Sequence, residues 1–138
     1  MSQPLEASGQ ALATGLTKMD RDSFNVYCRA KPGTTHVVQW GNADVWKVGG
    51  KVFALCGWND GRDAFTFKVT PMVFELLGRE PGYRPAPYMA SRGMTWLQVH
   101  EPDEVPDTDL RQHLDVSYEL VVAKLTKKAR HALGLGEK

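Results

Sequence analysis

Residues 45–55, VWKVGGKVFAL, carry the pattern from which the fold can be predicted. Two apolar runs rich in Val, Trp and Phe flank the pair Gly49 and Gly50, as is typical of two strands joined by a tight turn. Glycine takes the positive φ angles that a two-residue hairpin turn requires, so this pair predicts an antiparallel β-hairpin. The turn also sets the expected register, which pairs Val48 with Lys51, Lys47 with Val52, and Trp46 with Phe53.

In this register the two faces of the hairpin differ, because side chains alternate along a strand. One face is expected to be bulky and apolar and to need a helix layer over it, and it carries Trp46, Val48, Phe53 and Leu55. The thinner face carries Val45, Lys47, Val52, Ala54 and Cys56. Lys51 is then expected at the tip beside the bulky face, and Lys47 on the other face.

Similar runs on both sides of the hairpin extend it into a larger sheet. Residues 35–40 and 64–69 are rich in Val, Phe and Thr, and the turn chemistries GNA and WNDGR separate them from the hairpin. A further strand is expected at residues 94–99. The prolines in the loop at residues 82–93 argue against regular structure there. We therefore expect about five antiparallel strands, the first four in a meander.

Three helices are predicted around this sheet. Residues 21–30 place apolar side chains at helical spacing, with Asp20 or Asp22 available as the N-cap. A second helix follows Thr70 as its N-cap, has Pro71 at its first position and ends at Gly78.

The third helix is expected to be long and to lie across the sheet. It runs from Asp107 to about Lys127, and its apolar stripe consists of Leu110, Leu114, Ser117 or Tyr118, Val121 and Leu125. The order of the elements predicts an α+β fold, a two-layer sandwich with helices packed on one face of an antiparallel sheet.

The length and composition are those of one globular domain. The chain has 138 residues, 42% hydrophobic and 24% charged. We expect a single domain at residues 19–138 and a mobile N-terminal extension at residues 1–18. No apolar run approaches the roughly 18 residues of a membrane span, and the amino terminus lacks the features of a secretory leader. The sequence therefore predicts a cytoplasmic protein without a membrane partner.

The sequence offers little support for catalysis. It has no motif of a zinc protease, a serine hydrolase or a phosphate-binding glycine loop. The two cysteines are not spaced as zinc ligands, and Cys56 lies among apolar residues, so buried reduced thiols are expected. The four histidines are scattered, at His36, His100, His113 and His131. We therefore predict a protein that is not an enzyme and has no metal site and no cofactor.

Charge is unevenly placed although the net charge is only +1. Residues 101–109 carry five acids, whereas residues 123–131 carry four lysines or arginines, one histidine and no acid. These segments bracket the third predicted helix, so the helix dipole explains most of the asymmetry. The alternative is that the basic segment binds an anionic partner.

Four segments together resemble the MmcQ/YjbR family of small bacterial proteins, and they occur in that family's order. They are the passage from the first helix to KPGTT, the hairpin WKVGGKVFALCG, and the segments RPAPYMASRGMTWLQV and SYELVVAKLTKK. The resemblance covers about residues 20–133. It implies a frataxin-like sheet with helices on one side, and DNA binding through projecting hairpins that look like a double wing. This chain has Thr126 where the family tends to have proline, which implies a softer break in the last helix.

The hairpin lysines Lys47 and Lys51 are the leading candidates for contact with DNA, because a narrow rigid hairpin places lysines well for phosphate binding. A site of this kind needs further cations on the same face of the molecule, and the candidates are Arg84, Arg92, Lys124, Lys127, Lys128 and Arg130. Lysine beside a hairpin tip also protects a strand edge from aggregation, and this structural explanation stays open.

The loop at residues 82–93 is a second candidate site, since loops on a rigid scaffold often carry binding groups. The candidates for a ligand pocket are Arg84, Tyr88, Ser91, Arg92 and Trp58, the last from the turn GWNDGRD. An equally weighted explanation is that Arg84 and Tyr88 only tie the loop to the sheet. The other tryptophans lie in strand patterns and are expected in the core, at Trp40, Trp46 and Trp96.

Taken together, these features predict a non-catalytic protein that contacts the phosphates of double-stranded DNA with low sequence specificity. The alternative is an adaptor that binds a protein or a small ligand at the loop of residues 82–93, without nucleic acid.

Overall fold

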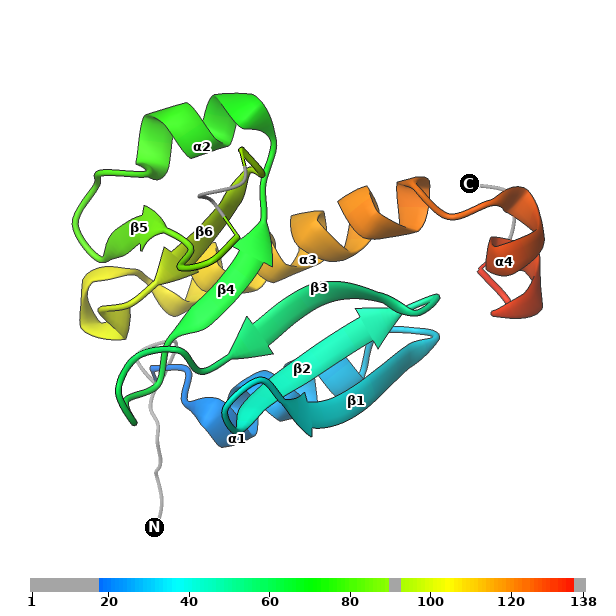
Figure 1. Ribbon diagram of the computed structural model, residues 1–138, viewed down its shortest axis with the longest axis horizontal. Helices are drawn as coiled ribbons and strands as arrows, with labels where there is room; N and C mark the ends of the chain where they lie inside the picture. Colours follow the sequence, from blue (N-terminus) through cyan, green and yellow to red (C-terminus); the bar gives the residue numbers. More distant parts are fainter. Residues whose placement is uncertain (1–17, 90–92, 136–138) are drawn as a thin grey trace, which may run out of the picture.

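The computed structural model describes residues 18–89 and 93–135 (Figure 1). An antiparallel sheet forms one layer, and helices pack against it, which confirms the predicted α+β fold. The predicted extension lies outside the described residues except for Lys18. The next residue, Met19, is already part of the core, with 2% of its surface exposed.

The sheet has six strands in the described part of the chain. They are β1 (Thr34–Gln39), β2 (Ala43–Val48), β3 (Lys51–Cys56), β4 (Phe65–Lys68), β5 (Tyr83–Pro85) and β6 (Trp96–Val99). Their order across the sheet is β1-β2-β3-β4-β6-β5. The predicted meander of four strands is therefore confirmed.

β5 corrects the expectation of about five strands and of a loop without regular structure at residues 82–93. It pairs antiparallel with β6, with Tyr83 opposite Val99 and Arg84 opposite Gln98. A proline is compatible with this strand because β5 lies at the sheet edge, where a missing N–H interrupts no ladder between two neighbours.

The helices are α1 (Arg21–Arg29), α2 (Pro71–Leu77), α3 (Asp107–Ala123) and α4 (Lys127–Ala132), with a 3-10 turn at Pro102–Glu104. Asp20 caps α1: its carboxylate accepts from Ser23 N at 2.8 Å, and Ser23 Oγ accepts from Asp20 N at 2.9 Å. Thr70 Oγ1 accepts from Val73 N and caps α2 as predicted. No helix within these described ranges is long and apolar enough to cross a membrane.

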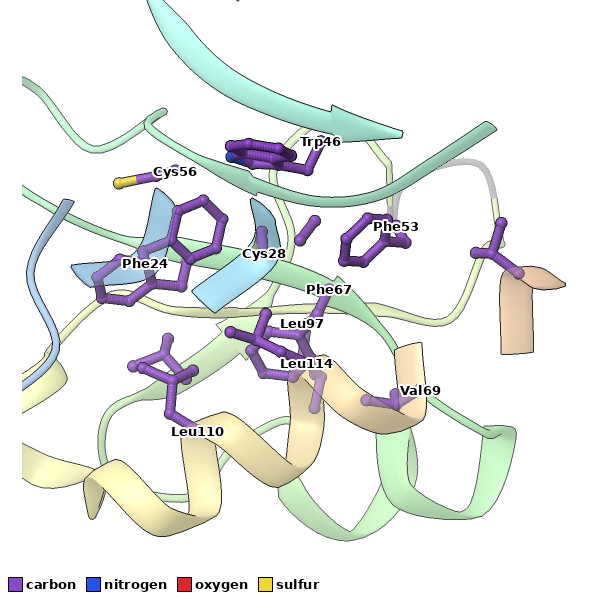
Figure 2. Packing of buried hydrophobic residues seen from close by; sticks show 14 of the residues in the cluster. Phe24, Cys28, Trp46, Phe53, Cys56, Phe67, Val69, Leu97, Leu110 and Leu114 are labelled. Atoms are coloured by element: carbon purple, nitrogen blue, oxygen red, sulfur yellow. The ribbon is translucent and has the colours of Figure 1, made fainter. Parts of the chain in front are cut away.

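The main core lies between the helices and one face of the sheet. Figure 2 shows Leu110 and Leu114 of α3 beneath the sheet residues Phe67 and Leu97. The predicted α3 stripe is confirmed, because its fully helical members Leu110, Leu114, Ser117 and Val121 are all buried. The position of α3 is therefore set by its apolar face, which packs across the strands of the sheet.

The register of the β2–β3 hairpin differs from the expected one by a β-bulge. Val48 pairs with Lys51 and Lys47 with Val52, as predicted, but Trp46 pairs with Ala54 instead of Phe53. Phe53 is the extra residue on β3, which shifts the alternation beyond it. The face assignments change accordingly: Ala54 and Cys56 join Trp46 in the main core, while Leu55 packs with Val45 on the opposite face.

Ser117 of α3 explains why the bulge is stable. Phe53 has no partner residue in the register of either neighbouring strand, and its carbonyl accepts a hydrogen bond from Ser117 Oγ at 2.6 Å. The same hydroxyl oxygen accepts from the backbone N–H of Lys68 in β4 at 2.8 Å. One buried hydroxyl thus joins the helix to two strands at the irregularity.

The last helix is interrupted, which corrects the predicted single helix from Asp107 to about Lys127. α3 ends at Ala123, and a new helix, α4, begins after Thr126, whose Oγ1 accepts from Ala129 N at 3.0 Å. Threonine is a good N-cap because its hydroxyl satisfies a backbone donor that has no helical partner. A full break is therefore achieved here without proline.

The second face of the sheet carries a row of paired side chains that crosses all six strands. The row runs Val37, Val45, Leu55, Thr66, Gln98 and Arg84, from β1 to β5. Its centre forms a small apolar cluster against which Trp58 packs. This face therefore changes from apolar to polar toward β5.

Candidate functional site

The tip of the β2–β3 hairpin touches the junction of α3 and α4. A Cβ atom added at Gly49 would lie 2.6 Å from Leu125 Cδ2, so the glycine backbone packs directly against this side chain. Leu125 is buried, with 6% of its surface exposed. The contact brings together two segments that are 76 positions apart, which Figure 1 shows at the same end of the molecule.

Four exposed lysines lie within three positions of Gly49 or Leu125 in the chain, and we call them the basic end: Lys51, Lys124, Lys127 and Lys128. Neither hairpin residues 45–57 nor residues 120–135 contain an acid. The helix dipole does not explain Lys127 and Lys128, because they occupy the first turn of α4 and not the end of a longer helix. The structural explanation that the sequence favoured is therefore wrong for these two lysines.

Two of the predicted cations, Lys47 and Arg130, are not part of the basic end. Lys47 pairs with Val52 and Thr35, on the face of the hairpin opposite Trp46 and Lys51, and is half-buried. Arg130 donates from Nη1 to the carbonyl of Leu125 at 2.9 Å, and its Nε is buried without a hydrogen-bond partner. Arg130 therefore stabilises the α3–α4 junction.

Arg84 also belongs to a different part of the molecule. Its Nε donates to Gln98 Oε1 at 2.6 Å, and Gln98 Nε2 donates in turn to the carbonyls of Gly57 and Trp58 at 3.2 and 3.3 Å. Arg84 is thus one of the side chains that tie β5 and β6 to the β3–β4 loop. Ser91 and Arg92, the remaining candidates of the 82–93 loop, lie outside the described residues.

A hollow of about 930 Å³ lies between the β1–β2 turn, the β3–β4 loop and the chain after β5. Three aromatic rings line it. Trp58 is central: its ring centroid lies 6.0 Å from that of Trp40 and 5.3 Å from that of Tyr88, the second pair meeting edge to face at 81°. The sequence predicted Trp58 and Tyr88 here, but it placed Trp40 in the core, whereas 48% of the Trp40 surface is exposed.

Backbone strain is concentrated in this hollow. Five non-glycine residues in the described ranges have positive φ, namely Trp40 (53°), Asn42 (69°), Trp58 (62°), Asp60 (51°) and Tyr88 (69°), and all five line the hollow. This conformation is unusual for a bulky side chain and costs about 1–3 kcal/mol per residue. Strain of this kind is typical of sites whose geometry serves a function and not stability.

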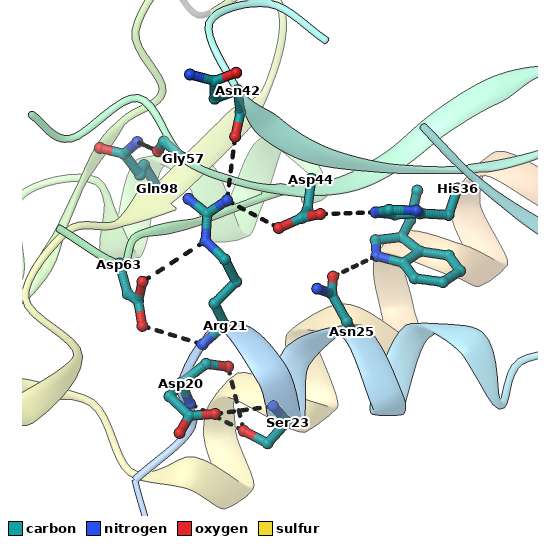
Figure 3. A network of polar contacts seen from close by, with 11 residues as sticks. Asp20, Arg21, Ser23, Asn25, His36, Asn42, Asp44, Gly57, Asp63 and Gln98 are labelled. Carbon is teal, nitrogen blue, oxygen red and sulfur yellow. Dashed lines mark hydrogen bonds and ion pairs between the residues drawn. The ribbon is translucent and has the colours of Figure 1, made fainter. Parts of the chain in front are cut away.

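Polar side chains hold the strained turns in place, as Figure 3 shows for Arg21. Its Nη1 donates to the carbonyl of Asn42 at 3.1 Å and to the carboxylate of Asp44 at 2.9 Å, while its Nε lies 3.9 Å from Asp63 Oδ1. Burial raises the pKa of Asp44, but hydrogen bonds from His36, Asn25 and Arg21 together bring it below its usual value. Asp44 is therefore ionised and anchors the β1–β2 turn to α1.

The two thiols are buried and free, as the sequence predicted. Burial raises the pKa of Cys28, and it raises the pKa of Cys56 to about 12. A thiol with a raised pKa is a poor nucleophile and a poor metal ligand. In residues 18–89 and 93–135, no group of three or more His, Cys, Asp or Glu side chains is arranged to hold a metal ion.

Several residues of the hollow were missed because their signal is weak in one sequence. Trp40 stands before Gly41 and Asn42, and Trp58 stands after Gly57 and before Asn59, so both tryptophans occupy turn chemistry. A tryptophan inside a turn signal is the only local indication of these exposed rings. Asp60 and Arg62 stand in the same turn as Trp58, and Met89 and Met94 lie in or just after the 82–93 loop, but nothing local marked them as members of one site. Arg21 comes from a distant helix and has no local signal at all.

Comparison with known proteins identifies the family. The YjbR family model matches residues 29–120. Two relatives named "Uncharacterized protein YjbR", from Escherichia coli strains K12 and O157:H7, are each 29% identical over 110 residues, which is 78% of this chain and 91% of theirs.

Two solved structures have a similar fold. A Deinococcus radiodurans protein described as a DUF419 domain has a TM-score of 0.76 at 26% identity, covering 90% of this chain and 93% of its own. A Pseudomonas syringae protein has a TM-score of 0.63 at 23% identity, covering 75% and 99%, and it shows likeness of fold alone. The resemblance found in the sequence is thereby confirmed. Since the family model matches well over half of its length, this chain belongs to the YjbR family.

Proposed function

We propose that the protein binds double-stranded DNA through the phosphate groups, without catalysis, and that the basic end is the contact surface. The observation that carries the proposal is the packing of Gly49 against Leu125. It brings Lys51 of the hairpin to the same end of the molecule as Lys124, Lys127 and Lys128. Cations from separate segments are what a phosphate-binding surface requires.

The proposed surface is smaller than the one the sequence suggested. Arg84 is excluded because it is bonded to Gln98, and Lys47 faces the other side of the hairpin. Contacts from about four lysines predict weak binding with little base specificity. A cytoplasmic location, which the sequence predicts, is part of this proposal.

The test is binding of a fluorescein-labelled 20-base-pair duplex, measured by fluorescence anisotropy as the salt concentration rises. Release of about four counterions predicts a slope near −3.6 in a plot of log K against log salt, or roughly a 100-fold loss between about 50 and 200 mM. Lys51→Glu combined with Lys128→Glu should abolish binding at low salt.

Two matched variants control for net charge. Lys47→Glu makes the same change on the same hairpin but on the opposite face, and Arg79→Glu makes it just after α2. Both should reduce affinity much less than Lys51→Glu. Absence of binding at low salt, or an equal loss in all three single variants, would sink the proposal.

A second candidate function is the binding of a small ligand or a protein segment beside residues 82–93. One observation favours it: the exposed ring of Tyr88 packs against Trp58 at the side of the 930 Å³ hollow. A hollow of this volume is within the range of small-molecule sites. This function is independent of DNA binding, because none of the four lysines of the basic end lines the hollow.

A further inference from the structure

We infer that the hollow beside Trp40, Trp58 and Tyr88 is a site for a small molecule with a flat aromatic ring and a negatively charged substituent. This inference rests on the second candidate function and names the chemistry of its ligand. It does not depend on DNA binding.

The aromatic rings favour a flat ring as the ligand. Large parts of the Trp40 and Tyr88 surfaces are exposed, 48% and 72%, although both side chains are apolar enough to belong in a core. Their centroids lie 6.0 and 5.3 Å from the Trp58 centroid, so each is already in contact with Trp58. Rings this close leave no gap for a cation enclosed between two ring faces. They form instead an aromatic wall of three rings, with Trp40 tilted by 35° and Tyr88 by 81° against Trp58, and another ring can stack on an exposed ring face of this wall.

The backbone favours a functional role for these rings over a structural one. Trp40, Trp58 and Tyr88 all have positive φ, a conformation that glycine adopts freely and bulky residues avoid. Folding alone would favour glycine at such positions, as at Gly41 between Trp40 and Asn42, which also has positive φ. The strained positions carry aromatic side chains, and all three side chains face one hollow.

The charges around the hollow favour an anionic substituent. Two guanidinium groups, Arg21 and Arg62, and one carboxylate, Asp60, line it. Arg21 is held by Asp44 and Asp63, whereas the exposed Arg62 side chain makes no ion pair with any residue that the structure describes. A guanidinium group binds carboxylate or phosphate through two parallel hydrogen bonds.

The wall is held in its shape before any ligand binds. Trp58 Nε1 donates to the carbonyl of Trp40 at 3.1 Å, which joins the two turns. The Trp58 carbonyl accepts from Gln98 Nε2 at 3.3 Å and lies 3.5 Å from Arg84 Nη2. Since the turns are already ordered, binding costs little conformational entropy.

The experiment uses ¹⁵N-labelled full-length protein and follows the indole N–H signals of the four tryptophans by NMR. The probe is 2-naphthoate, and the matched probes are cyclohexanecarboxylate, which has the charge without the flat ring, and 2-naphthylmethylamine, which has the ring with the opposite charge. Naphthoate should shift the Trp40 and Trp58 signals in a saturable way. The Trp46 and Trp96 signals should not move, because these side chains are buried.

Three variants assign the effect to the hollow. Trp40→Gly removes one ring while glycine keeps the backbone conformation, and it should weaken naphthoate binding by about 5-fold or more. Arg62→Gln should weaken naphthoate binding and leave binding of 2-naphthylmethanol unchanged. Met72→Ala removes an exposed apolar side chain that lies on α2, and it should leave the binding of both naphthoate and 2-naphthylmethanol unchanged.

Each outcome decides one part of the inference. Equal binding of naphthoate and cyclohexanecarboxylate would contradict the inference that the ligand has a flat aromatic ring, while the second candidate function would still hold. Equal binding of naphthoate and 2-naphthylmethylamine would contradict the inference that the ligand carries a negatively charged substituent. If no probe shifts Trp40 or Trp58, the inference and the small-ligand form of that function both fail.

Discussion

Gly49 lies against Leu125, and this contact joins the hairpin tip to the junction between α3 and α4. A Cβ atom at position 49 would come within 2.6 Å of Leu125 Cδ2 and 2.8 Å of Leu125 Cδ1. The neighbouring Gly50 has nothing within 4 Å of the same hypothetical atom. The two turn glycines are therefore conformationally alike and sterically different, which makes them a matched pair.

Gly49→Ala should lower the free energy of unfolding by about 2–5 kcal/mol. About 1–2 kcal/mol arises from the left-handed backbone, since φ is +60°, and about 1–3 kcal/mol from overlap with a buried side chain. Gly50→Ala should show only the backbone part, because φ is +79° but the space is open. Urea denaturation of both variants measures the difference, and equal losses would contradict the contact.

Ser117→Ala should lower the free energy of unfolding by about 2–6 kcal/mol although it removes a single oxygen atom. The substitution leaves the buried Phe53 carbonyl and the Lys68 N–H without their partner, and each unsatisfied group costs about 1–3 kcal/mol. Glu119→Ala, at an exposed position of the same helix, should change stability by less than about 0.5 kcal/mol. If Ser117→Ala is as mild as this control, Ser117 does not stabilise the bulge.

The stability of the protein should fall as the pH drops below 6.5, and His113 should account for part of the loss. Burial against Phe67, on whose ring His113 stacks at 4.9 Å, lowers the pKa of His113 below its usual 6.5, although nearby Asp109 opposes the shift. The unfolded chain then takes up a proton more readily than the folded one, which favours unfolding in acid.

His113→Phe should remove this component, because phenylalanine keeps the stacking and cannot be protonated. It also loses the hydrogen bond between His113 Nε2 and the Tyr83 hydroxyl, 2.9 Å apart, so the variant is compared with itself at different pH values. The measurement is the slope of unfolding free energy against pH between about 5 and 7. An unchanged slope would mean that His113 takes no part.

Trp40→Gly should leave the stability within about 1 kcal/mol of the wild type. Relief of about 1–2 kcal/mol of left-handed strain offsets the lost contact with Trp58 and the higher chain entropy of glycine. Trp46→Gly, at a core position with 2% exposure, should cost about 3–5 kcal/mol or more. A large loss in Trp40→Gly would show that this ring serves stability, and it would weaken the case for the ligand site.

The elements of this protein were largely determined by local sequence. The glycine pair, the caps at Asp20 and Thr70, and the α3 stripe each depend on residues close together in the chain, and period two or 3.6 is visible there. The meander and the α+β class follow from the order of such elements. Family membership, too, was recognisable from four short segments.

The features that depend on residues far apart in the chain, the β-bulge and the edge strand β5, follow only from the tertiary structure. The bulge at Phe53 exists because Ser117, which is 64 positions away, supplies its carbonyl with a partner. β5 forms because β6 offers it an edge, although its own sequence contains proline. Neither partner is visible in the local pattern, and local patterns were the basis of the prediction.

The candidate sites divide in the same way. The sequence identified the exposed lysines and two of the aromatic residues, because residue type is a local property. The fold alone places Lys51 at the same end of the molecule as Lys127 and Lys128. It also gives Arg84 a hydrogen bond to Gln98. Trp40 is exposed and packs beside Trp58 for the same reason. The physical reason is that a shared surface is made by packing, which brings distant side chains together by contacts that no single segment encodes.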